Sequence, residues 1–475
     1  MSQPRNLLVI MSDEHQAAAL GAAGHPLAQT PHLDRLARRG LRFTNAVTPS
    51  PICVPARAAF ASGDYVHRTG HWDNAMPYTG RPPGWGHALQ AAGIRVESIG
   101  KLHYRAADDP NGFDIEHIPM MVAGGVGMVW ASIRGEEERW APEGRMLGAE
   151  IGPGESAYTR YDSAVVDETR AWLRDARAHE APWCLFVGLV APHFPLVAPP
   201  AFYDLYAAAP LPGRKLHPAD GHPRHPWVEK QNAYLDSEGR FAGPEERDRA
   251  IRAYFGLCSW LDHNVGQILA ALEEAGLSPE TAVVYTSDHG DNVGARGLWG
   301  KSNMYREAVG VPLILAAPGG PVGEVQTPVS LLDLSATIAD HFGASLSPGR
   351  PGRSLFDVAA RPDPDRIVFS EYHAAGAVSG AFMVQSTRAK YIHYEGFAPE
   401  LFDLVEDPGE NRDLAGDPAY AALEAEMRDA LHAICNPAAV DAQAHRDQAA
   451  LVARLGGREA VRTLGAPGAT PPPAS

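Results

Sequence analysis

Four short segments of this 475-residue chain carry side chains that suit catalysis or ion binding. They are SDEH at 12–15, GKLH at 100–103, APHFP at 191–195 and SDHGDN at 287–292. Each follows an apolar run that predicts a buried strand. Because ligands bind beyond the carboxyl ends of strands in open α/β sheets, we expect all four segments to face one rim of a sheet.

Three of these residues have the chemistry of a divalent-cation site. Asp13, Asp288 and His289 offer two carboxylates and one imidazole, a set that suits Ca²⁺, Mg²⁺ or Mn²⁺ better than structural zinc. Taken singly, an acid after a strand is more often a helix cap or a turn residue. Asp288 and Asp291 in SDHGD repel each other unless a cation or a base lies nearby. The sequence therefore predicts a metal site.

Lysine is rare in this chain, with five residues at positions 101, 215, 230, 301 and 390. Lys101 and Lys301 both occur in Gly-Lys dipeptides close after predicted strand ends. An ammonium beside a metal can clamp an anion or protonate a leaving group. The alternative is a solvated loop lysine at each position, but the clustering of the two disfavours it.

Cys53 lies in PICVPARAAF, where Pro55 and the residues after it predict the start of a helix. The positive end of a helix dipole attracts anions and also stabilises a thiolate. One interpretation is a cysteine nucleophile paired with a histidine. The other is a small residue that fills a tight turn, and the segment alone does not separate the two.

Composition excludes several classes of function. The chain has 41 Lys and Arg against 57 Asp and Glu, a formal net charge of -16. Such a surface repels phosphate backbones, so we expect no nucleic-acid partner and no membrane partner. The four cysteines show no CxxC spacing, and neither a signal-peptide core nor a membrane-spanning run is present, so we expect a cytoplasmic protein.

Strands and helices alternate over most of the chain. Apolar runs at 6–11, 182–190 and 281–287 predict buried strands, and amphipathic stretches at 163–178 and 245–275 predict helices between them. This alternation predicts an α/β fold with a large mixed, mostly parallel sheet sandwiched by helices.

The pattern changes near residue 365. Short runs at hairpin-like spacing predict a smaller C-terminal antiparallel sheet, with one helix over residues 418–433 packed on it. The end of the chain, GAPGATPPPAS, has the composition of a disordered segment. We therefore expect a catalytic α/β domain over residues 1–365, an α+β subdomain over 366–464, and a disordered tail over 465–475.

The chain resembles the sulfatase family of the alkaline phosphatase superfamily. CVPAR at 53–57 matches the Cys-x-Pro-x-Arg signature, and the segments at 11–15, 100–103, 191–195 and 286–301 follow the family's order. LFDLVEDPGENRDLA at 401–415 resembles the family's C-terminal segment, so the resemblance covers most of the chain. It implies an alkaline phosphatase-like fold and hydrolysis of a small organic or aryl sulfate ester, as in arylsulfatases.

The resemblance also implies a covalent mechanism at position 53. In this family a formylglycine-generating enzyme oxidises the cysteine to formylglycine (3-oxoalanine), which hydrates to a geminal diol. One hydroxyl attacks sulfur, the alcohol leaves, and the second hydroxyl then loses a proton and expels sulfate. A divalent metal, Ca²⁺ in the first place and Mn²⁺ or Mg²⁺ as alternatives, neutralises the sulfate charge.

Residue roles carry over from the family's motifs by position. Asp13, Asp288 and His289 are implied metal ligands together with residue 53, and Arg57 holds the formylglycine. Lys101, Lys301, His193 and Asn74 are implied sulfate or leaving-group contacts, and His103 helps to deprotonate the diol.

Some positions depart from the common pattern. Glu14 stands where many sulfatases have a second Asp, so the resemblance does not decide whether Glu14 or Asn292 joins the metal site. The pair Asp288 and His289 resembles choline-sulfatases and phosphonate monoester hydrolases, which makes a phosphonate monoester or phosphodiester hydrolase the alternative function. Lys101 favours the sulfatase. A homo-oligomer is compatible with the sequence.

Overall fold

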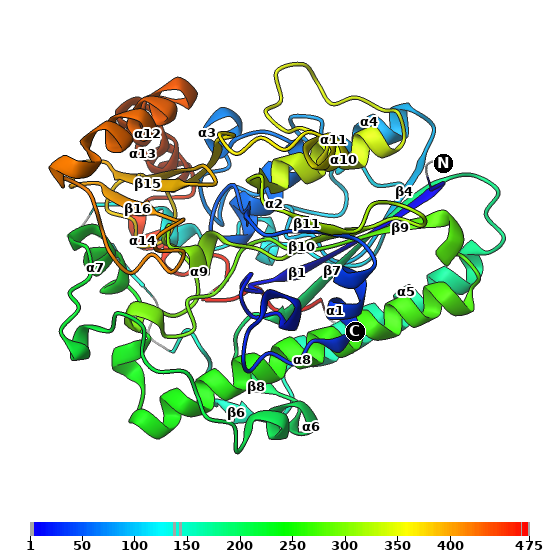
Figure 1. The fold of residues 1–475 in the computed structure, drawn as a ribbon, viewed down its shortest axis with the longest axis horizontal. Coiled ribbons are helices and arrows are strands. Elements are labelled where there is room, and N and C mark those ends of the chain that lie inside the picture. Colours follow the sequence, from blue (N-terminus) through cyan, green and yellow to red (C-terminus); the bar gives the residue numbers. More distant parts are fainter. Residues whose placement is uncertain (1–3, 136–138, 142–144, 467, 474–475) are drawn as a thin grey trace.

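The computed structural model describes residues 4–135, 139–141, 145–466 and 468–473. Its main feature is an eight-stranded sheet in the order β11-β2-β10-β9-β1-β7-β4-β5 (Figure 1). The strands of the described chain are β1 (Asn6–Asp13), β2 (Leu41–Phe43), β3 (Ala46–Val47), β4 (Arg95–Lys101), β5 (Ile115–Met120), β6 (Gly152–Pro153), β7 (Trp183–Pro192), β8 (Val197–Ala198), β9 (Thr281–Ser287), β10 (Leu313–Ala316), β11 (Gly323–Val325), β12 (Val329–Ser330), β13 (Val368–Tyr372), β14 (Ala381–Gln385), β15 (Ala389–Tyr394) and β16 (Glu400–Asp403).

The helices cover both faces of this sheet and part of a second one. They are α1 (Pro31–Arg38), α2 (Cys53–Ser62), α3 (Val66–Thr69), α4 (Trp85–Ala91), α5 (Ala157–Ala176), α6 (Pro200–Tyr203), α7 (Pro226–Asn232), α8 (Pro244–Glu274), α9 (Arg306–Val309), α10 (Leu331–His341), α11 (Leu355–Ala360), α12 (Ala421–Ile434), α13 (Pro437–Arg454) and α14 (Arg458–Val461).

The central strand β1 shows why the sheet needs helices on both sides. All eight of its residues are buried, and successive side chains of a strand point to opposite faces. Val9 belongs to the core under α2, α4 and α10, whereas Leu8 and Ile10 belong to the core under α1, α5 and α8. Figure 1 shows the two helical layers on either side of the sheet. An apolar run without alternation is the signature of such a doubly covered strand.

Strand direction matches the expected mixed, mostly parallel sheet. β1 pairs in parallel with β7 and β9, and β4 pairs in parallel with β7 and β5. β10 runs antiparallel to both of its neighbours, β9 and β2. The carboxyl ends of β1, β4, β7 and β9 therefore meet at one edge, which is where the sequence predicts the chemistry.

A smaller antiparallel sheet, β13-β14-β15-β16, follows in the chain and carries α12 on one side. Two helices that the sequence analysis did not anticipate, α13 and α14, come after α12. The start of α13 has a sequence signal, because Pro437 is its first residue and the Asn436 side chain accepts a hydrogen bond from the Ala439 amide. The boundary near residue 365 between a catalytic domain and a subdomain stays a prediction.

The last described residues differ from the predicted disorder. Thr470 is buried, and the chain around it returns from α14 toward the middle of the molecule, as the red trace of Figure 1 shows. Composition alone indicated a free tail because Pro, Gly and Ala bury little apolar area. The contacts described below hold it in place instead.

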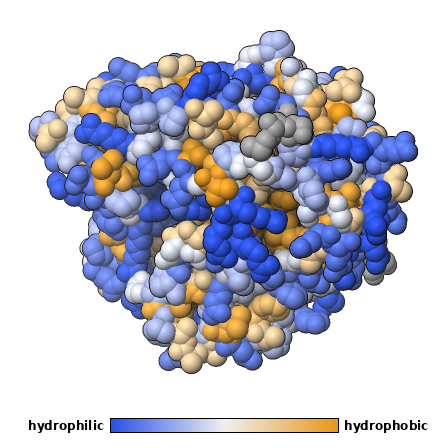
Figure 2. Space-filling model, turned by 45° about the vertical axis from the view of Figure 1, so that its right-hand side comes forward, coloured by the Kyte–Doolittle hydropathy of each residue, from blue (hydrophilic) through white to orange (hydrophobic). Residues whose placement is uncertain are grey.

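One face of the molecule is mainly polar. On the face drawn in Figure 2, hydrophilic residues predominate and apolar residues form small separate groups. Within the part of the chain that the structure describes, no helix combines the length and the apolar character that crossing a bilayer requires.

Candidate active site

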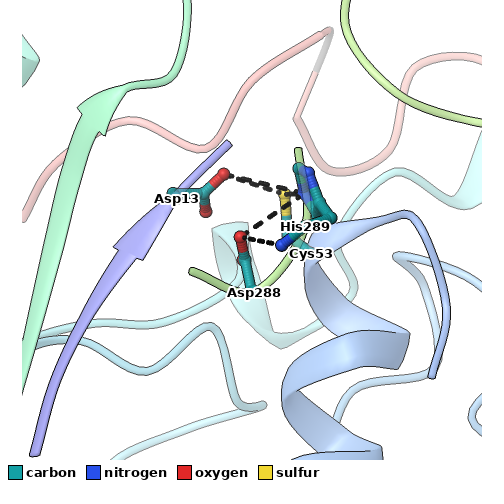
Figure 3. A group of neighbouring side chains, drawn as sticks. All are labelled: Asp13, Cys53, Asp288 and His289. Carbon is teal, nitrogen blue, oxygen red and sulfur yellow. Dashed lines mark hydrogen bonds and ion pairs between the residues drawn. The ribbon is translucent and has the colours of Figure 1, made fainter. Parts of the chain in front are cut away.

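The carboxyl ends of β1 and β9 bring two acidic residues side by side. Ser12 pairs with Ser287 in the parallel register, so Asp13 and Asp288, one residue further on, lie next to each other although 275 positions separate them in the sequence. His289 follows directly. All three side chains are fully buried, and Figure 3 shows them converging with Cys53.

Cys53 is the first residue of α2, and Ile52 before it has the extended backbone of an N-cap. Its Sγ atom lies 3.5 Å from Asp13 Oδ1 and 3.2 Å from His289 Nε2. Burial and the nearby Asp13 carboxylate raise the pKa of the Cys53 thiol to about 12. The encoded side chain is therefore a protonated thiol, placed at the positive end of a helix.

Arg57 lies one helical turn after Cys53 and so on the same face of α2. Its Nε donates to Asp288 Oδ2 at 2.7 Å, and its Nη2 donates to Asp13 Oδ2 at 3.3 Å. Lys101, at the end of β4, places Nζ 2.5 Å from the same Asp13 Oδ2. Arg57 and Lys101 thus bind the Oδ2 atoms, here called the outer oxygens, and the Oδ1 atoms of Asp13 and Asp288 are the inner oxygens.

The inner oxygens face a common point. Asp13 Oδ1 and Asp288 Oδ1 lie 3.7 and 3.6 Å from His289 Nε2. His289 Nδ1 is 3.0 Å from the Gly290 carbonyl, which can only accept, so Nδ1 carries the proton and Nε2 presents its lone pair. One donor atom from each of Asp13, Cys53, Asp288 and His289 lies within 4.8 Å of the others. Two carboxylate oxygens and an oriented imidazole nitrogen fit a divalent cation.

A second group adjoins the first. Lys301 Nζ donates to Glu14 Oε2 at 3.0 Å and to His193 Nε2 at 2.8 Å. His193 Nδ1 is 2.6 Å from the Phe194 carbonyl, so Nδ1 bears the proton and Nε2 accepts from the lysine. Burial, reinforced by the Lys301 charge, holds the pKa of His193 well below its usual value. Burial opposes the charge of Lys301, but its acidic neighbours Glu14 and Asp13 raise its pKa overall.

Glu14 and Asn292, whose part in the metal site the resemblance leaves open, both have defined contacts. Asp13, Glu14 and His193 form a second set of closely spaced donor atoms, in which Glu14 faces Lys301. The Asn292 amide donates to the Gly300 carbonyl at 2.6 Å, so this part of its side chain serves the loop that carries Lys301.

His103 and Asn74 reach the same cavity from other loops. His103 Nε2 is 2.7 Å from the hydroxyl of Thr470, and burial together with the Lys101 charge lowers the pKa of His103. The Asn74 side chain accepts from the Val54 amide at 3.2 Å and thereby caps the first turn of α2. Its amide group points to Met128, whose sulfur is 3.7 Å away.

All these side chains border one cavity of about 390 Å³ or lie directly beneath it. Its lining includes residues that the sequence analysis did not single out, among them Met128, Tyr158, Trp299 and Thr470. Tyr158 had a usable signal, since Ser156 caps α5 by accepting from the Thr159 amide, which places the helix start before the predicted residue 163. No comparable sequence signal predicts Thr470 as a lining residue, because no local pattern distinguishes a polar residue in a Pro/Gly/Ala-rich segment.

Trp130 lines the cavity, whereas His217 and His225 are not among its lining residues. His225 instead stacks on Tyr394 of the small sheet, with ring centroids 4.4 Å apart. His217 bonds Glu238 and accepts from the Ala219 amide, which are local structural contacts.

The fold and this site define a member of the alkaline phosphatase-like enzymes, and comparison with known proteins identifies the family. The Sulfatase family model matches residues 5–344, and a model for the C-terminal part of N-sulphoglucosamine sulphohydrolase matches residues 294–436. The chain belongs to the sulfatase family and is a sulfuric ester hydrolase.

Several relatives match nearly the whole chain. A choline-sulfatase from Rhizobium meliloti (strain 1021) is 31% identical over 471 residues, covering 94% of this chain and 89% of the relative. Arylsulfatase K of Danio rerio is 28% identical, covering 86% and 80%. The crystal structure of the phosphonate monoester hydrolase of Agrobacterium radiobacter superposes with a TM-score of 0.75 at 23% identity, covering 93% and 96%. This last likeness concerns the fold.

Proposed function

We propose that the protein hydrolyses the sulfate ester of a small organic or aryl alcohol through a formylglycine formed from Cys53, with a divalent cation bound beside it. The observation that carries this proposal is the convergence of Cys53 with Asp13, Asp288 and His289, flanked by the ammonium groups of the site. The family signature at 53–57 supports the modification, and the site is reached from a cavity of small-molecule size.

The cation site is supported by the way the acids share their oxygens. Arg57 and Lys101 occupy the Oδ2 atoms, so the Oδ1 atoms of Asp13 and Asp288 stay directed at His289 Nε2 and Cys53. The oxygen-rich donor set favours Ca²⁺, with Mn²⁺ and Mg²⁺ as alternatives. When bound, the cation supplies charge neutralisation for sulfate and lowers the pKa of the attacking hydroxyl.

The chain's own residues would divide the remaining work. Lys101 and Lys301 bind sulfate oxygens, and Lys301 with His193 lies where the leaving alcohol needs a proton. Arg57 holds residue 53 against the acids, and His103, kept neutral by burial, accepts a proton from the hydrated aldehyde. Asn74, whose side chain caps the first turn of α2, contacts the sulfate.

Maturation would require a formylglycine-generating enzyme as a transient partner. Mass spectrometry of the peptide that contains residue 53, from a host that has this enzyme, should show formylglycine. A fully active protein with unmodified cysteine would refute the mechanism. A cytoplasmic location and a homo-oligomeric state stay predictions.

The alternative is a phosphonate monoester or phosphodiester hydrolase that uses the same residues. The fold likeness to a phosphonate monoester hydrolase favours it, whereas the Lys101 ammonium beside Asp13 favours sulfate. Rates on aryl sulfate and aryl phosphonate monoesters, measured on one preparation, separate the two. Faster turnover of the phosphonate would overturn our first choice.

A further inference from the structure

The C-terminal segment is attached to the loop that carries Trp130. The Ala466 amide donates to the Gly127 carbonyl at 3.1 Å, and the Trp130 indole donates to the Ala466 carbonyl at 3.0 Å. Gly465 has φ +72°, and a Cβ at this position would lie 1.7 Å from the Gly127 carbonyl oxygen. Only glycine permits this approach, so residues 465–466 form a specific anchor.

Beyond the anchor, residues 468–473 are here called the tail segment, and its first three residues reach the active-site cavity. Gly468, Ala469 and Thr470 line the same cavity as Cys53. The Thr470 hydroxyl is 2.7 Å from His103 Nε2, and the Thr470 carbonyl accepts from the Tyr158 hydroxyl at 2.5 Å. Thr470 is 7% exposed, whereas Pro471 is exposed to solvent. The segment therefore has an inner side toward the site and an outer side toward water.

The position of the tail segment limits the space above residue 53. The cavity volume of about 390 Å³ lies near the lower end of the roughly 300–1,000 Å³ typical of small-molecule sites. Trp130 and Phe194 form other parts of the wall. A sulfate group with an alcohol of about one ring fills such a space, and a disaccharide needs the volume that Gly468, Ala469 and Thr470 occupy.

Thr470 also acts on His103. In the described part of the chain, His103 Nδ1 has no hydrogen-bond partner, so the Thr470 hydroxyl is the group that fixes the ring. A base whose ring rotates freely loses the alignment that proton transfer needs. Thr470 is thus a positioning residue for His103.

We propose that the tail segment is a substrate-size filter, which restricts this sulfatase to esters of small alcohols and holds His103 through Thr470. This inference rests on the proposed function and narrows it to a substrate class. The filter acts by steric exclusion, and the positioning acts through one hydrogen bond, so the two parts are separable by mutation.

The first experiment compares the intact protein with a variant that lacks residues 468–475 and keeps the anchor. Sulfate release is measured from ethyl sulfate, 4-nitrophenyl sulfate and a sulfated disaccharide. We expect truncation to raise kcat/KM for the disaccharide about tenfold or more relative to 4-nitrophenyl sulfate. An unchanged ratio would overturn the size filter. An equal rise for all three esters would also overturn it, since the segment would then be a competing occupant.

The second experiment tests the hydrogen bond. Thr470→Val keeps the shape of the side chain and removes the hydroxyl, and Thr470→Ser keeps the hydroxyl. We expect Thr470→Val to lower kcat for ethyl sulfate about tenfold with little change in KM, and Thr470→Ser to restore most of it. The pH dependence of kcat should shift in Thr470→Val only. Equal kcat and pH profile in all three proteins would remove the positioning role.

A measurement of binding affinity tests the filter without depending on turnover. In Cys53→Ala, calorimetry with ethyl sulfate and with the sulfated disaccharide compares affinities with and without residues 468–475. Improved disaccharide binding only in the truncated protein supports the filter even where no ester is hydrolysed. Absence of hydrolysis by an intact protein with confirmed formylglycine rejects the proposed function, and unchanged disaccharide affinity rejects the filter.

Discussion

Two charge clusters in this protein use similar side chains and differ in how their carboxylates are paired. In the first, here called the saturated cluster and made of Lys215, Arg296, Glu307, Lys390 and Glu410, every carboxylate oxygen has a donor. Glu307 binds Lys215 at 2.5 Å and Arg296 at 3.1 Å through separate oxygens. Glu410 binds Lys390 at 2.9 Å and a backbone amide at 2.9 Å.

The active-site cluster leaves one oxygen of each acid without a cationic donor. Arg57 and Lys101 bind Oδ2 of Asp13, and Arg57 binds Oδ2 of Asp288. The Oδ1 atoms turn to a ring nitrogen that presents a lone pair. Asp288 Oδ1 also accepts the Glu14 and His289 amides, so the difference lies in direction. Acids paired with fixed donors serve stability and register, whereas carboxylate oxygens that converge with a lone pair on one point are suited to bind an ion. The following predictions test this difference.

The largest effect is expected from Asp288→Asn. Loss of this carboxylate removes a donor at the convergent point, so turnover of an aryl sulfate should fall at least about a thousandfold. Glu307→Gln is the matched control in the saturated cluster, and its kcat should stay within about twofold of wild type. Sulfate release by folded, formylglycine-containing protein is the measurement. More than a tenth of wild-type turnover in Asp288→Asn would contradict the assignment.

Metal removal should distinguish the clusters without mutation. Dialysis against a chelator should abolish turnover and lower Tm, and Ca²⁺ or Mn²⁺ should restore both. A ligand present at 100 times its Kd stabilises the folded state by about 2.7 kcal/mol. Asp13→Asn serves as the control, since its Tm should no longer respond to the cation. Full activity of a preparation shown by elemental analysis to be metal-free would refute the site.

Lys390→Met should destabilise the fold and spare catalysis. Glu410 would remain buried without its cation, which costs about 3–5 kcal/mol in comparable cases. The double variant Lys390→Met/Glu410→Gln should recover part of this loss because no uncompensated charge is left. Thermal and urea unfolding measure stability, and kcat per folded molecule measures the site. A fall in kcat as large as that of Asp288→Asn would contradict the difference between the saturated cluster and the active-site cluster.

A smaller effect concerns Glu371, a buried acid outside both clusters, which binds His67 at 2.8 Å and His373 at 3.0 Å. Burial opposes ionisation of Glu371, but His67 and His373 lower its pKa to about 2. Burial opposes protonation of His67, but Glu371 raises its pKa above the usual 6.5. Ionised Glu371 therefore stabilises the fold above pH 4.5, its ordinary pKa, and this stabilisation is lost as the pH falls toward 2. Protonated His67 stabilises the fold below pH 6.5, its ordinary pKa, and this stabilisation is lost as the pH rises through the raised pKa.

Glu371→Gln should therefore cost most between about pH 4.5 and 6.5, by about 1–3 kcal/mol, and less on either side. Unfolding of the two proteins across this range is the measurement, with Glu307→Gln as the comparison. A stability difference that does not vary with pH would show that the histidines are not coupled to Glu371.

Local sequence determined the parts of this protein that depend on short range. Apolar runs of strand length, a helix-start signal at Pro55, and the CVPAR segment at 53–57 were sufficient to predict the α/β class and the four site segments. These segments lie at one edge of the sheet because the strands that precede them run in the same direction. The second helix of the C-terminal part, α13, was missed although Asn436 and Pro437 mark its start.

Tertiary structure alone decided how the charges are shared and what covers the site. Which oxygen of Asp13 faces Lys101, and which faces His289, depends on three elements meeting at one point, and no local pattern encodes it. The same holds for Thr470, whose segment has the composition of a free tail and gains its order from contacts with Tyr158 and His103, more than 300 residues away. Composition measures what a segment buries by itself, and these contacts exist only once the rest of the fold has formed.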